Sequence, residues 1–478
     1  MALVDLKRRS ALLAAALTAA ALTAPAAAQA ANCPREGRVD VPRAAFQEQA
    51  CLDDLSTRST QLSGHTERDD WDGLHADRSR NPSGFPGLQV DGYFPDSSTS
   101  NANNGYFHDS QFVIRLPNDW NGKLVITGAP GVRAQYANDF LISDFVLDRG
   151  YAFAATDKGN TGVNFFRDGE RPGDAVAEWH RRVTQLTRQS KKVVAQRYGK
   201  RPERTYMTGI SNGGYLTRYA LENHPELYDG GVDWEGTLFR RGENLLSYLP
   251  ATLRNYPEYE ATGDEQAHDR IIRAGFEPGS EFLWPDHYAT YWDLTQRIYR
   301  EELDPGYDGP LEAGIPFCQQ GTPNCDANYR YPERPERVKK AVESVASSGA
   351  IGKKMITLHG NLDALLPIDV DSNPYAKLIE RNGEAPHRYY KIGKGNHVDG
   401  YYDNFPHRLR PILPCYRASF LALVRWVEDR RHPPRSQYVP KREPSGGDGV
   451  VNNCAIGGAE YHGRGRPAGS APPPPQSP

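Results

Sequence analysis

The sequence predicts an α/β protein whose mostly parallel sheet is covered by helices on both faces. From Gln111 onward, short apolar strands alternate with helical segments, and this alternation is typical of parallel sheets whose strands are joined by helices. A glycine-rich turn at 209–213 joins one strand to the helix that follows it. Two polar loops follow the predicted strands 354–360 and 387–392. Because parallel strands end at the same edge of a sheet, we expect a site at that edge.

The predicted elements are told apart by their length and periodicity. Short runs rich in apolar, β-branched and aromatic residues indicate strands, whereas the amphipathic stretch 175–198 and the segment 416–431 indicate helices. A shorter helix is expected near 140–148. The predicted strands are 111–116, 123–127, 151–155, 204–208, 230–233, 354–360 and 387–392.

Residues 209–213 have the sequence Gly-Ile-Ser-Asn-Gly, the G-x-S-x-G pattern of a nucleophile elbow. The bare pattern also occurs by chance in glycine-rich turns, but here a strand precedes it and a helix follows it. Gly209 and Gly213 allow the tight turn, because a Cβ at either position would crowd the neighbouring chain. We therefore expect Ser211 to be held clear of the sheet as a nucleophile. This arrangement predicts the α/β-hydrolase fold.

A serine nucleophile needs a histidine base and a carboxylate that orients it, and in this fold they follow in the order Ser, Asp or Glu, His. Asp363 lies just past the strand 354–360, and His397 lies in the loop after the strand 387–392. These are the predicted acid and base. His359 is a rival base, although its position is also typical of a strand-end histidine bonded to backbone. The rival carboxylates fit the chain order less well and are Asp371, Asp399 and Asp403.

Two backbone N–H groups should form the oxyanion hole. One is expected from Asn212, which directly follows the nucleophile. The other should come from the Gly-Ala-Pro-Gly loop after the strand 123–127. Because Pro130 has no N–H, Ala129 or Gly131 must supply it, and the sequence leaves both open. An ordinary strand-to-helix turn would contain the same glycines and proline.

The first thirty residues have the features of an export signal. Basic residues at 7–9 precede an alanine- and leucine-rich run at 11–24, and Ala28-Gln29-Ala30 before Ala31 has the pattern of a small-residue cleavage site. The run is too short and too rich in alanine for a convincing membrane span. We expect a secreted protein, extracellular or periplasmic, and both the general and the twin-arginine export routes stay open.

The cysteine content agrees with an oxidising compartment. Pairing of neighbours in sequence would join 33 with 51, 318 with 325 and 415 with 454, although the spacing leaves other connectivities open. No cysteine spacing is typical of a metal site, and we expect no metal and no cofactor. The six cysteines are Cys33, Cys51, Cys318, Cys325, Cys415 and Cys454.

The charge balance bears on the partners of the protein. Lysine and arginine number 57 against 60 aspartate and glutamate residues, which gives a net charge of −3. So mild a balance argues against nucleic acid and against an anionic membrane as partners. We expect a small or oligomeric ester substrate instead, with no nucleic-acid and no membrane partner.

The chain divides into a signal peptide at 1–30, an irregular extension at 31–110, a catalytic domain at 111–440 and a tail at 441–478. The tail is rich in proline and glycine, and we expect it to be partly disordered. An insertion at about 237–350 interrupts the catalytic domain and is rich in tyrosine and tryptophan. Such rings suit a lid over an apolar or aromatic substrate group, and they equally suit the core of a helical subdomain.

Several segments resemble secreted bacterial α/β-hydrolases of the tannase and feruloyl esterase group and the related 3-hydroxybutyrate oligomer hydrolases. They are the elbow at 209–214, the loops at 359–367 and 395–400, and the block 131–162. The resemblance covers about residues 110–430 and implies an ester hydrolase.

One departure from the group bears on the substrate. Tannases and feruloyl esterases have a cysteine directly before the serine and another directly after the histidine, where this chain has Ile210 and Val398. The resemblance therefore favours short-chain hydroxyalkanoate oligomers or polyester fragments as substrates. An aromatic esterase of the tannase or feruloyl type is the alternative. A secreted binding protein without activity is a second alternative, against which the complete order of Ser, Asp and His speaks.

Overall fold

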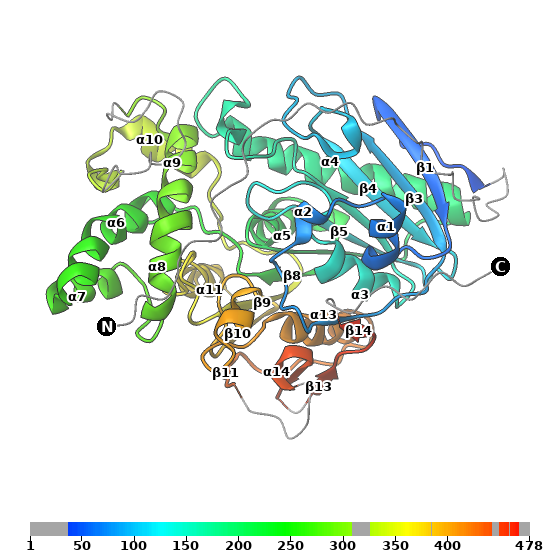
Figure 1. Cartoon of the computed structure of the whole chain (residues 1–478). Helices are drawn as coiled ribbons and strands as arrows, with labels where there is room; N and C mark the ends of the chain where they lie inside the picture. Colours follow the sequence, from blue (N-terminus) through cyan, green and yellow to red (C-terminus); the bar gives the residue numbers. More distant parts are fainter. Residues whose placement is uncertain (1–36, 308–325, 384, 442–448, 458, 468–478) are drawn as a thin grey trace, which may run out of the picture.

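A ten-stranded sheet forms the centre of the computed structural model, which describes residues 37–307, 326–383, 385–441, 449–457 and 459–467 (Figure 1). The strand order is β1-β3-β4-β6-β5-β7-β8-β9-β10-β11. The pairs from β1 to β6 are antiparallel, and the pairs from β6 to β11 are parallel. The strands are β1 (Phe46–Leu52), β3 (Gly87–Tyr93), β4 (Gln111–Pro117), β5 (Lys123–Gly128), β6 (Ala152–Thr156), β7 (Arg204–Ile210), β8 (Gly230–Trp234), β9 (Lys354–Gly360), β10 (His387–Ile392) and β11 (Gln437–Val439).

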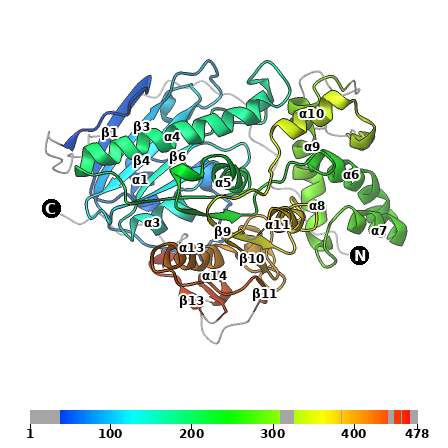
Figure 2. The same ribbon diagram turned by 180° about the vertical axis from the view of Figure 1, so that it is seen from behind.

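Helices cover both faces of this sheet, as Figures 1 and 2 show from opposite sides. In β5, Leu124 packs in one core with Trp179 of α4, whereas the next residue, Val125, packs in the other core with Phe420 of α13. Strands that are buried on both faces are typical of parallel sheets. The helices outside the insertion are α1 (Thr57–Ser63), α2 (Arg68–Trp71), α3 (Asp144–Leu147), α4 (Asp174–Tyr198), α5 (Asn212–Asn223), α11 (Ser372–Arg381), α12 (Tyr401–Asn404), α13 (Leu413–Glu428) and α14 (Gly449–Asn452).

The predicted α/β fold is confirmed. Each strand expected between 111 and 392 is present, and the helix expected at 175–198 is α4. The helix expected near 140–148 begins as a π-helical turn at Asp139–Ser143 and continues as α3. These strands and helices each have a clear local pattern of apolar residues, which was sufficient to identify them.

The expectation of an irregular segment at 31–110 is wrong for the part that the structure describes. Here β1 and β3 extend the sheet by antiparallel pairing, and β3 buries Leu88 and Val90 against the core. The segment is polar overall, so its apolar residues are few. Its strands depend on pairing with β4, a contact between distant residues that a local pattern does not show.

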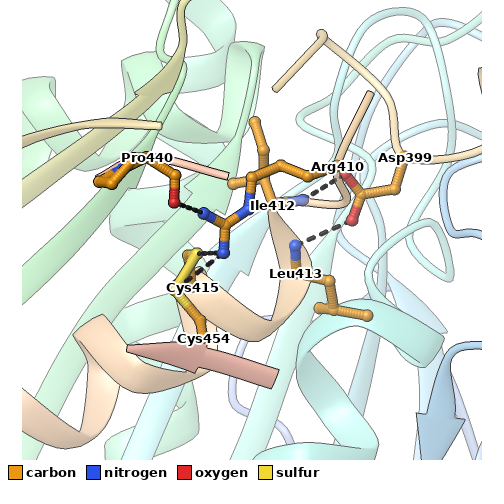
Figure 3. Close-up of a disulfide and its surroundings, with 7 residues drawn as sticks. All are labelled: Asp399, Arg410, Ile412, Leu413, Cys415, Pro440 and Cys454. Atoms are coloured by element: carbon orange, nitrogen blue, oxygen red, sulfur yellow. Dashed lines mark hydrogen bonds between the residues drawn. A yellow bond between two sulfur atoms is a disulfide. The ribbon is translucent and has the colours of Figure 1, made fainter. Parts of the chain in front are cut away.

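The tail contains ordered elements in its described part. Helix α14 is followed by the hairpin of β12 (Asn453–Ile456) and β13 (Ala459–His462). A disulfide joins Cys454 of β12 to Cys415 of α13, as Figure 3 shows. Further along, β14 (Arg466–Pro467) pairs with β2 (Arg80–Asn81). The covalent link and the hairpin hold a segment whose composition alone indicates disorder.

The predicted cysteine pairs have different outcomes. The Cys415–Cys454 pairing is confirmed, with a sequence separation of 39. Cys51 is also disulfide-bonded. The remaining predicted members, Cys33, Cys318 and Cys325, lie outside the described residues, as does the export signal at 1–30.

The insertion between β8 and β9 forms a helical subdomain at one end of the sheet, on the left in Figure 1. Aromatic rings fill its interior, and Trp284 and Trp292 are fully buried there. Within the described residues, no helix combines the length and the apolar character that crossing a membrane requires. The helices of the insertion are α6 (Leu245–Thr262), α7 (Glu265–Arg273), α8 (Trp284–Asp286), α9 (Trp292–Leu303) and α10 (Glu336–Ser344).

Candidate active site

Ser211 lies in a strained turn between β7 and α5. Its φ is 57° and its ψ is −122°, a backbone conformation that a residue with a side chain rarely adopts. A Cβ added to Gly209 would lie 2.5 Å from the carbonyl carbon of Gly213, and one added to Gly213 would lie 2.5 Å from the oxygen of Gly128. Both positions therefore require glycine. The turn has the geometry that the sequence predicts for an elbow.

The structure brings together Ser211, His397 and Asp363 from three separate loops. His397 Nε2 lies 3.1 Å from Ser211 Oγ. On the other side of the ring, His397 Nδ1 donates to Asp363 Oδ2 at 2.7 Å. Because this bond places the proton on Nδ1, Nε2 is left to accept the serine proton. The three side chains are thus arranged as a nucleophile, a base and an orienting carboxylate.

Backbone and side-chain donors hold Asp363 in its ionised form. Its Oδ1 accepts the N–H groups of Leu365 and Leu366, both at 2.8 Å. Burial opposes ionisation of this carboxyl, but the charge of His397 and hydrogen bonds from His359 and His397 outweigh it and lower the pKa of Asp363. A carboxylate that stays charged fixes the tautomer of the histidine beside it.

The rival base, His359, lies beside Asp363, and its ring nitrogens contact groups other than Ser211. Its Nε2 donates to the carbonyl of Leu366 at 2.8 Å and lies 3.2 Å from Asp363 Oδ2. Its Nδ1 accepts the hydroxyl of Ser372 at 2.7 Å. The backbone-bonded alternative for His359 is therefore the one that the structure contains.

The rival carboxylates have structural partners elsewhere. Asp371 forms an ion pair with Arg218 at 3.1 Å, and Asp403 Oδ2 accepts the N–H of Asp77 at 2.9 Å. Asp399 accepts the N–H groups of Ile412 at 2.6 Å and Leu413 at 2.8 Å, at the start of α13 (Figure 3). A carboxylate at this end of a helix is stabilised by the unpaired N–H groups there. Because Asp399 comes two residues after the histidine, this contact anchors the loop that carries His397.

Of the two candidates for the second oxyanion donor, Ala129 is already engaged. Its N–H donates to the carbonyl of Thr156 at 3.0 Å. The prediction of Ala129 as an oxyanion donor is therefore wrong. Gly131 lines the cavity above Ser211 together with Asn212. The side chain of Asn212 donates to the carbonyl of Gly131 at 3.0 Å and fixes the loop against the elbow. As the first residue of α5, Asn212 has an N–H with no partner inside its helix.

A cavity of about 250 Å³ opens over Ser211 and His397. Its walls come from the loop after β5, from the insertion and from the loops after β9 and β10, and they are mostly apolar. Among the tyrosines and tryptophans of the insertion, Tyr291 and Tyr299 line this cavity. Pro130, Ile210 and Val398, which the sequence placed beside the predicted oxyanion donors, serine and histidine, also line it. Sequence reasoning missed the remaining walls, which are Gly73, Leu74, Val132, Arg133, Thr237, Leu245, His287, Leu294, Thr295, Ile298, Leu365, Leu366 and Tyr401.

One group of possible metal ligands occurs among the described residues. Ligand atoms of Glu235, His359 and Asp363 lie within 4.8 Å of one another. However, His359 Nε2 donates to the carbonyl of Leu366, so this nitrogen holds a proton and has no lone pair for a cation. Asp363 Oδ2 accepts His397 Nδ1. The cluster is therefore a hydrogen-bonded network and a poor metal site.

Residues 100–233 match the protein family described as "Tannase and feruloyl esterase". The matched segment includes the strands β4 to β8 and the elbow, and it ends before Asp363 and His397. The chain is also 28% identical over 141 residues to the mono(2-hydroxyethyl) terephthalate hydrolase of Piscinibacter sakaiensis. That similarity spans 27% of this chain and 23% of the relative, so the chain matches about a quarter of the relative's length.

Solved structures share the fold over most of the chain. Feruloyl esterase B from Aspergillus oryzae superposes with a TM-score of 0.50 at 15% identity, covering 87% of this chain and 92% of that one. The tannin acyl hydrolase from Aspergillus niger gives a TM-score of 0.50 at 13% identity, covering 80% and 83%. At these identities the likeness shows the fold alone. The chain has the α/β-hydrolase fold and resembles the tannase and feruloyl esterase group.

Proposed function

We propose that this protein is a secreted serine carboxylic ester hydrolase. The observation that carries the proposal is the continuous line from Asp363 through His397 to Ser211, with contacts of 2.7 and 3.1 Å, on the wall of an apolar cavity. A binding protein without activity has no use for this alignment together with a strained serine. The family match at residues 100–233 supports ester hydrolysis as the reaction class.

The mechanism proceeds in two acyl transfers. Ser211 Oγ attacks the ester carbonyl while His397 Nε2 takes the serine proton, and Asp363 stabilises the imidazolium that forms. The oxyanion receives hydrogen bonds from the N–H groups of Asn212 and Gly131. His397 then returns the proton to the leaving alcohol. Water, activated by the same histidine, attacks the acyl-enzyme and releases the acid.

We further propose that the substrates are short hydroxyalkanoate oligomers, such as 3-hydroxybutyrate oligomers, or other polyester fragments. Ile210 and Val398 occupy the positions of the cysteine pair of tannases and feruloyl esterases, which disfavours the aromatic-ester alternative. By its name, the Piscinibacter relative hydrolyses a monoester of terephthalic acid. Such an ester has one free carboxylate, which lies across the aromatic ring from the bond that is cleaved, and a hydroxy-acid oligomer likewise has one free carboxylate at its end.

Arg133 is suited to receive that carboxylate. Within the described part of the chain, it is the one lysine or arginine that lines the cavity. Its Nη1 donates to the carbonyls of Asp69 at 3.0 Å and Asp70 at 2.6 Å, which fix the guanidinium in place. A fixed guanidinium in a partly desolvated wall binds a carboxylate more strongly than one in water.

A substrate panel tests this choice. We expect kcat/KM to be higher for 3-hydroxybutyrate trimer than for methyl ferulate or methyl gallate. Arg133→Gln should raise KM for the trimer by about tenfold, equivalent to about 1.4 kcal/mol, and should change KM for the methyl ester of the trimer much less. Arg133→Lys is the matched control, and its KM for the trimer should lie between those of the wild type and Arg133→Gln. A tenfold preference for either aromatic ester would instead favour an aromatic carboxylic esterase.

A further inference from the structure

A second buried carboxyl lies beside the Nδ1 side of His397. Glu235 directly follows β8, has a φ of 51° and is fully buried. Its Oε1 accepts the N–H of Gly360 at 2.7 Å. Its Oε2 is buried without a hydrogen-bond partner among the described residues, and it lies 3.7 Å from His397 Nδ1. The same nitrogen donates to Asp363 at 2.7 Å, so His397 faces two carboxyls.

We propose that Glu235 is a positioning residue for His397: a neutral carboxyl beside Nδ1 that becomes the anionic partner of the imidazole whenever Asp363 is not ionised. This inference rests on the proposed role of His397 as the base. It also gives a reason for the burial of Glu235 Oε2 without a partner among the described residues. A buried polar atom without a hydrogen bond lowers the stability of a protein, so its presence calls for an explanation.

The two carboxyls differ in their donors. A carboxylate oxygen of each lies within 4.8 Å of the other, and two negative charges at that separation inside a protein repel strongly. Asp363 accepts the N–H groups of Leu365 and Leu366 and the ring of His397. Glu235 accepts one N–H, from Gly360. The negative charge is therefore more stable on Asp363, and the proton belongs to Glu235.

The wider surroundings favour the same assignment. Burial and the charge of Asp363 raise the pKa of Glu235 well above its ordinary value, and the charges of Asp399 and Asp233 add to this. Asp233 is paired with Arg218 at 2.8 Å. His359, which also faces the cluster, directs its Nε2 proton at Leu366 and Asp363. Removal of the charge on Asp363 would remove the main repulsion and lower the pKa of Glu235.

A purely structural role for Glu235 predicts different behaviour. Its backbone N–H donates to Leu358 at 2.9 Å, and its side chain accepts from Gly360, so the residue joins the ends of β8 and β9. Glutamine at this position keeps the acceptor for Gly360 and the neutral charge. If joining the strands were the whole role, the Glu235→Gln substitution would have the same effect whether or not Asp363 is present.

A double-mutant cycle separates the two roles. We expect Glu235→Gln to lower kcat/KM by less than tenfold in the wild-type background. Added to Asp363→Asn, it should lower kcat/KM by at least a further tenfold beyond its effect in the wild type. The Asp363→Asn enzyme should also show a limb of its pH profile, with activity rising as Glu235 ionises, that is missing from the double variant. Equal effects in both backgrounds and an unchanged profile would overturn the proposal.

Glu302→Gln is the matched control substitution. Glu302 is also a buried glutamate whose pKa is raised by burial, and it accepts the N–H groups of Ala175 and Val176 at the start of α4. The Glu302→Gln substitution should change kcat/KM by the same factor in the wild-type and the Asp363→Asn backgrounds. Ser211→Ala is measured in parallel: an active Ser211→Ala enzyme overturns the proposed function together with this inference, whereas an inactive one with an additive cycle overturns the role of Glu235 alone.

An infrared measurement tests the protonation state without relying on turnover. At neutral pH, the spectrum of the wild type minus that of Glu235→Gln should contain the carbonyl band of a protonated carboxylic acid. A carboxylate band in that difference spectrum would overturn the proposal even if the variants fold poorly.

Discussion

Asn212 Nδ2 donates a hydrogen bond to the hydroxyl of Tyr299 at 2.8 Å, and this bond joins the elbow helix to helix α9 of the insertion. The same amide group donates to the carbonyl of Gly131, and its oxygen accepts the hydroxyl of Thr237 at 3.0 Å. Asn212, the residue that follows the nucleophile, therefore connects three parts of the cavity wall. The position of the insertion is thereby coupled to the geometry of the proposed oxyanion hole.

Tyr299→Phe should lower kcat by about two- to tenfold, because a hydrogen bond of this kind contributes about 0.5–1.5 kcal/mol. The measurement is steady-state hydrolysis of a short p-nitrophenyl ester. Tyr256→Phe is the matched control, since the hydroxyl of Tyr256 contacts Glu260 at 3.0 Å inside the same insertion. Equal losses in the two variants would show that the effect is only on the stability of the insertion.

Ser211→Ala and His397→Ala should each lower kcat by several orders of magnitude, and the double variant should be scarcely worse than either single one. Nucleophile and base act as a unit, so removal of one already removes the function of the other. The check is kcat for the three purified variants on one activated ester. Near-normal turnover by His397→Ala would mean that another group is the base.

Loss of the Cys415–Cys454 disulfide should lower the free energy of unfolding by about 2–4 kcal/mol, because the bond closes a loop and restricts the unfolded chain. The variant Cys415→Ala/Cys454→Ala, followed by urea denaturation, measures this loss. Arg410, whose guanidinium contacts Cys415 Sγ at 3.2 Å and the carbonyl of Pro440 at 2.9 Å (Figure 3), should remain in place. A change below 0.5 kcal/mol, which is the scale of an ordinary surface substitution, would contradict the prediction.

His287 should contribute to acid destabilisation. Burial lowers its pKa from 6.5 to about 4. Between these values the unfolded state binds a proton that the folded state does not, so stability falls as the pH falls through this window, by up to about 3 kcal/mol. His287→Gln should show a shallower decline of unfolding free energy from pH 7 to pH 4.5. An equally steep decline in the variant would contradict the assignment.

The sequence predicts those parts of the site that depend on the order of strands and loops along the chain. Ser211, Asp363 and His397 each follow a strand of clear pattern, so their shared edge follows from the parallel sheet. The parts that it does not predict depend on contacts between distant residues. Glu235 shows no local signal besides its position at the end of β8, and the anchoring of Asp399 depends on the start of α13. The strands β1 and β3 were likewise hidden, because their pairing partner lies elsewhere in the chain.

Fluorophosphonate labelling followed by peptide mass analysis tests the central claim most directly, because the reagent reacts only with a serine that a base activates. We predict one adduct on Ser211, formed in step with the loss of esterase activity, absent from Ser211→Ala and strongly slowed in His397→Ala. Full esterase activity without an adduct, or an adduct on another serine that accounts for the loss of activity, would contradict the account.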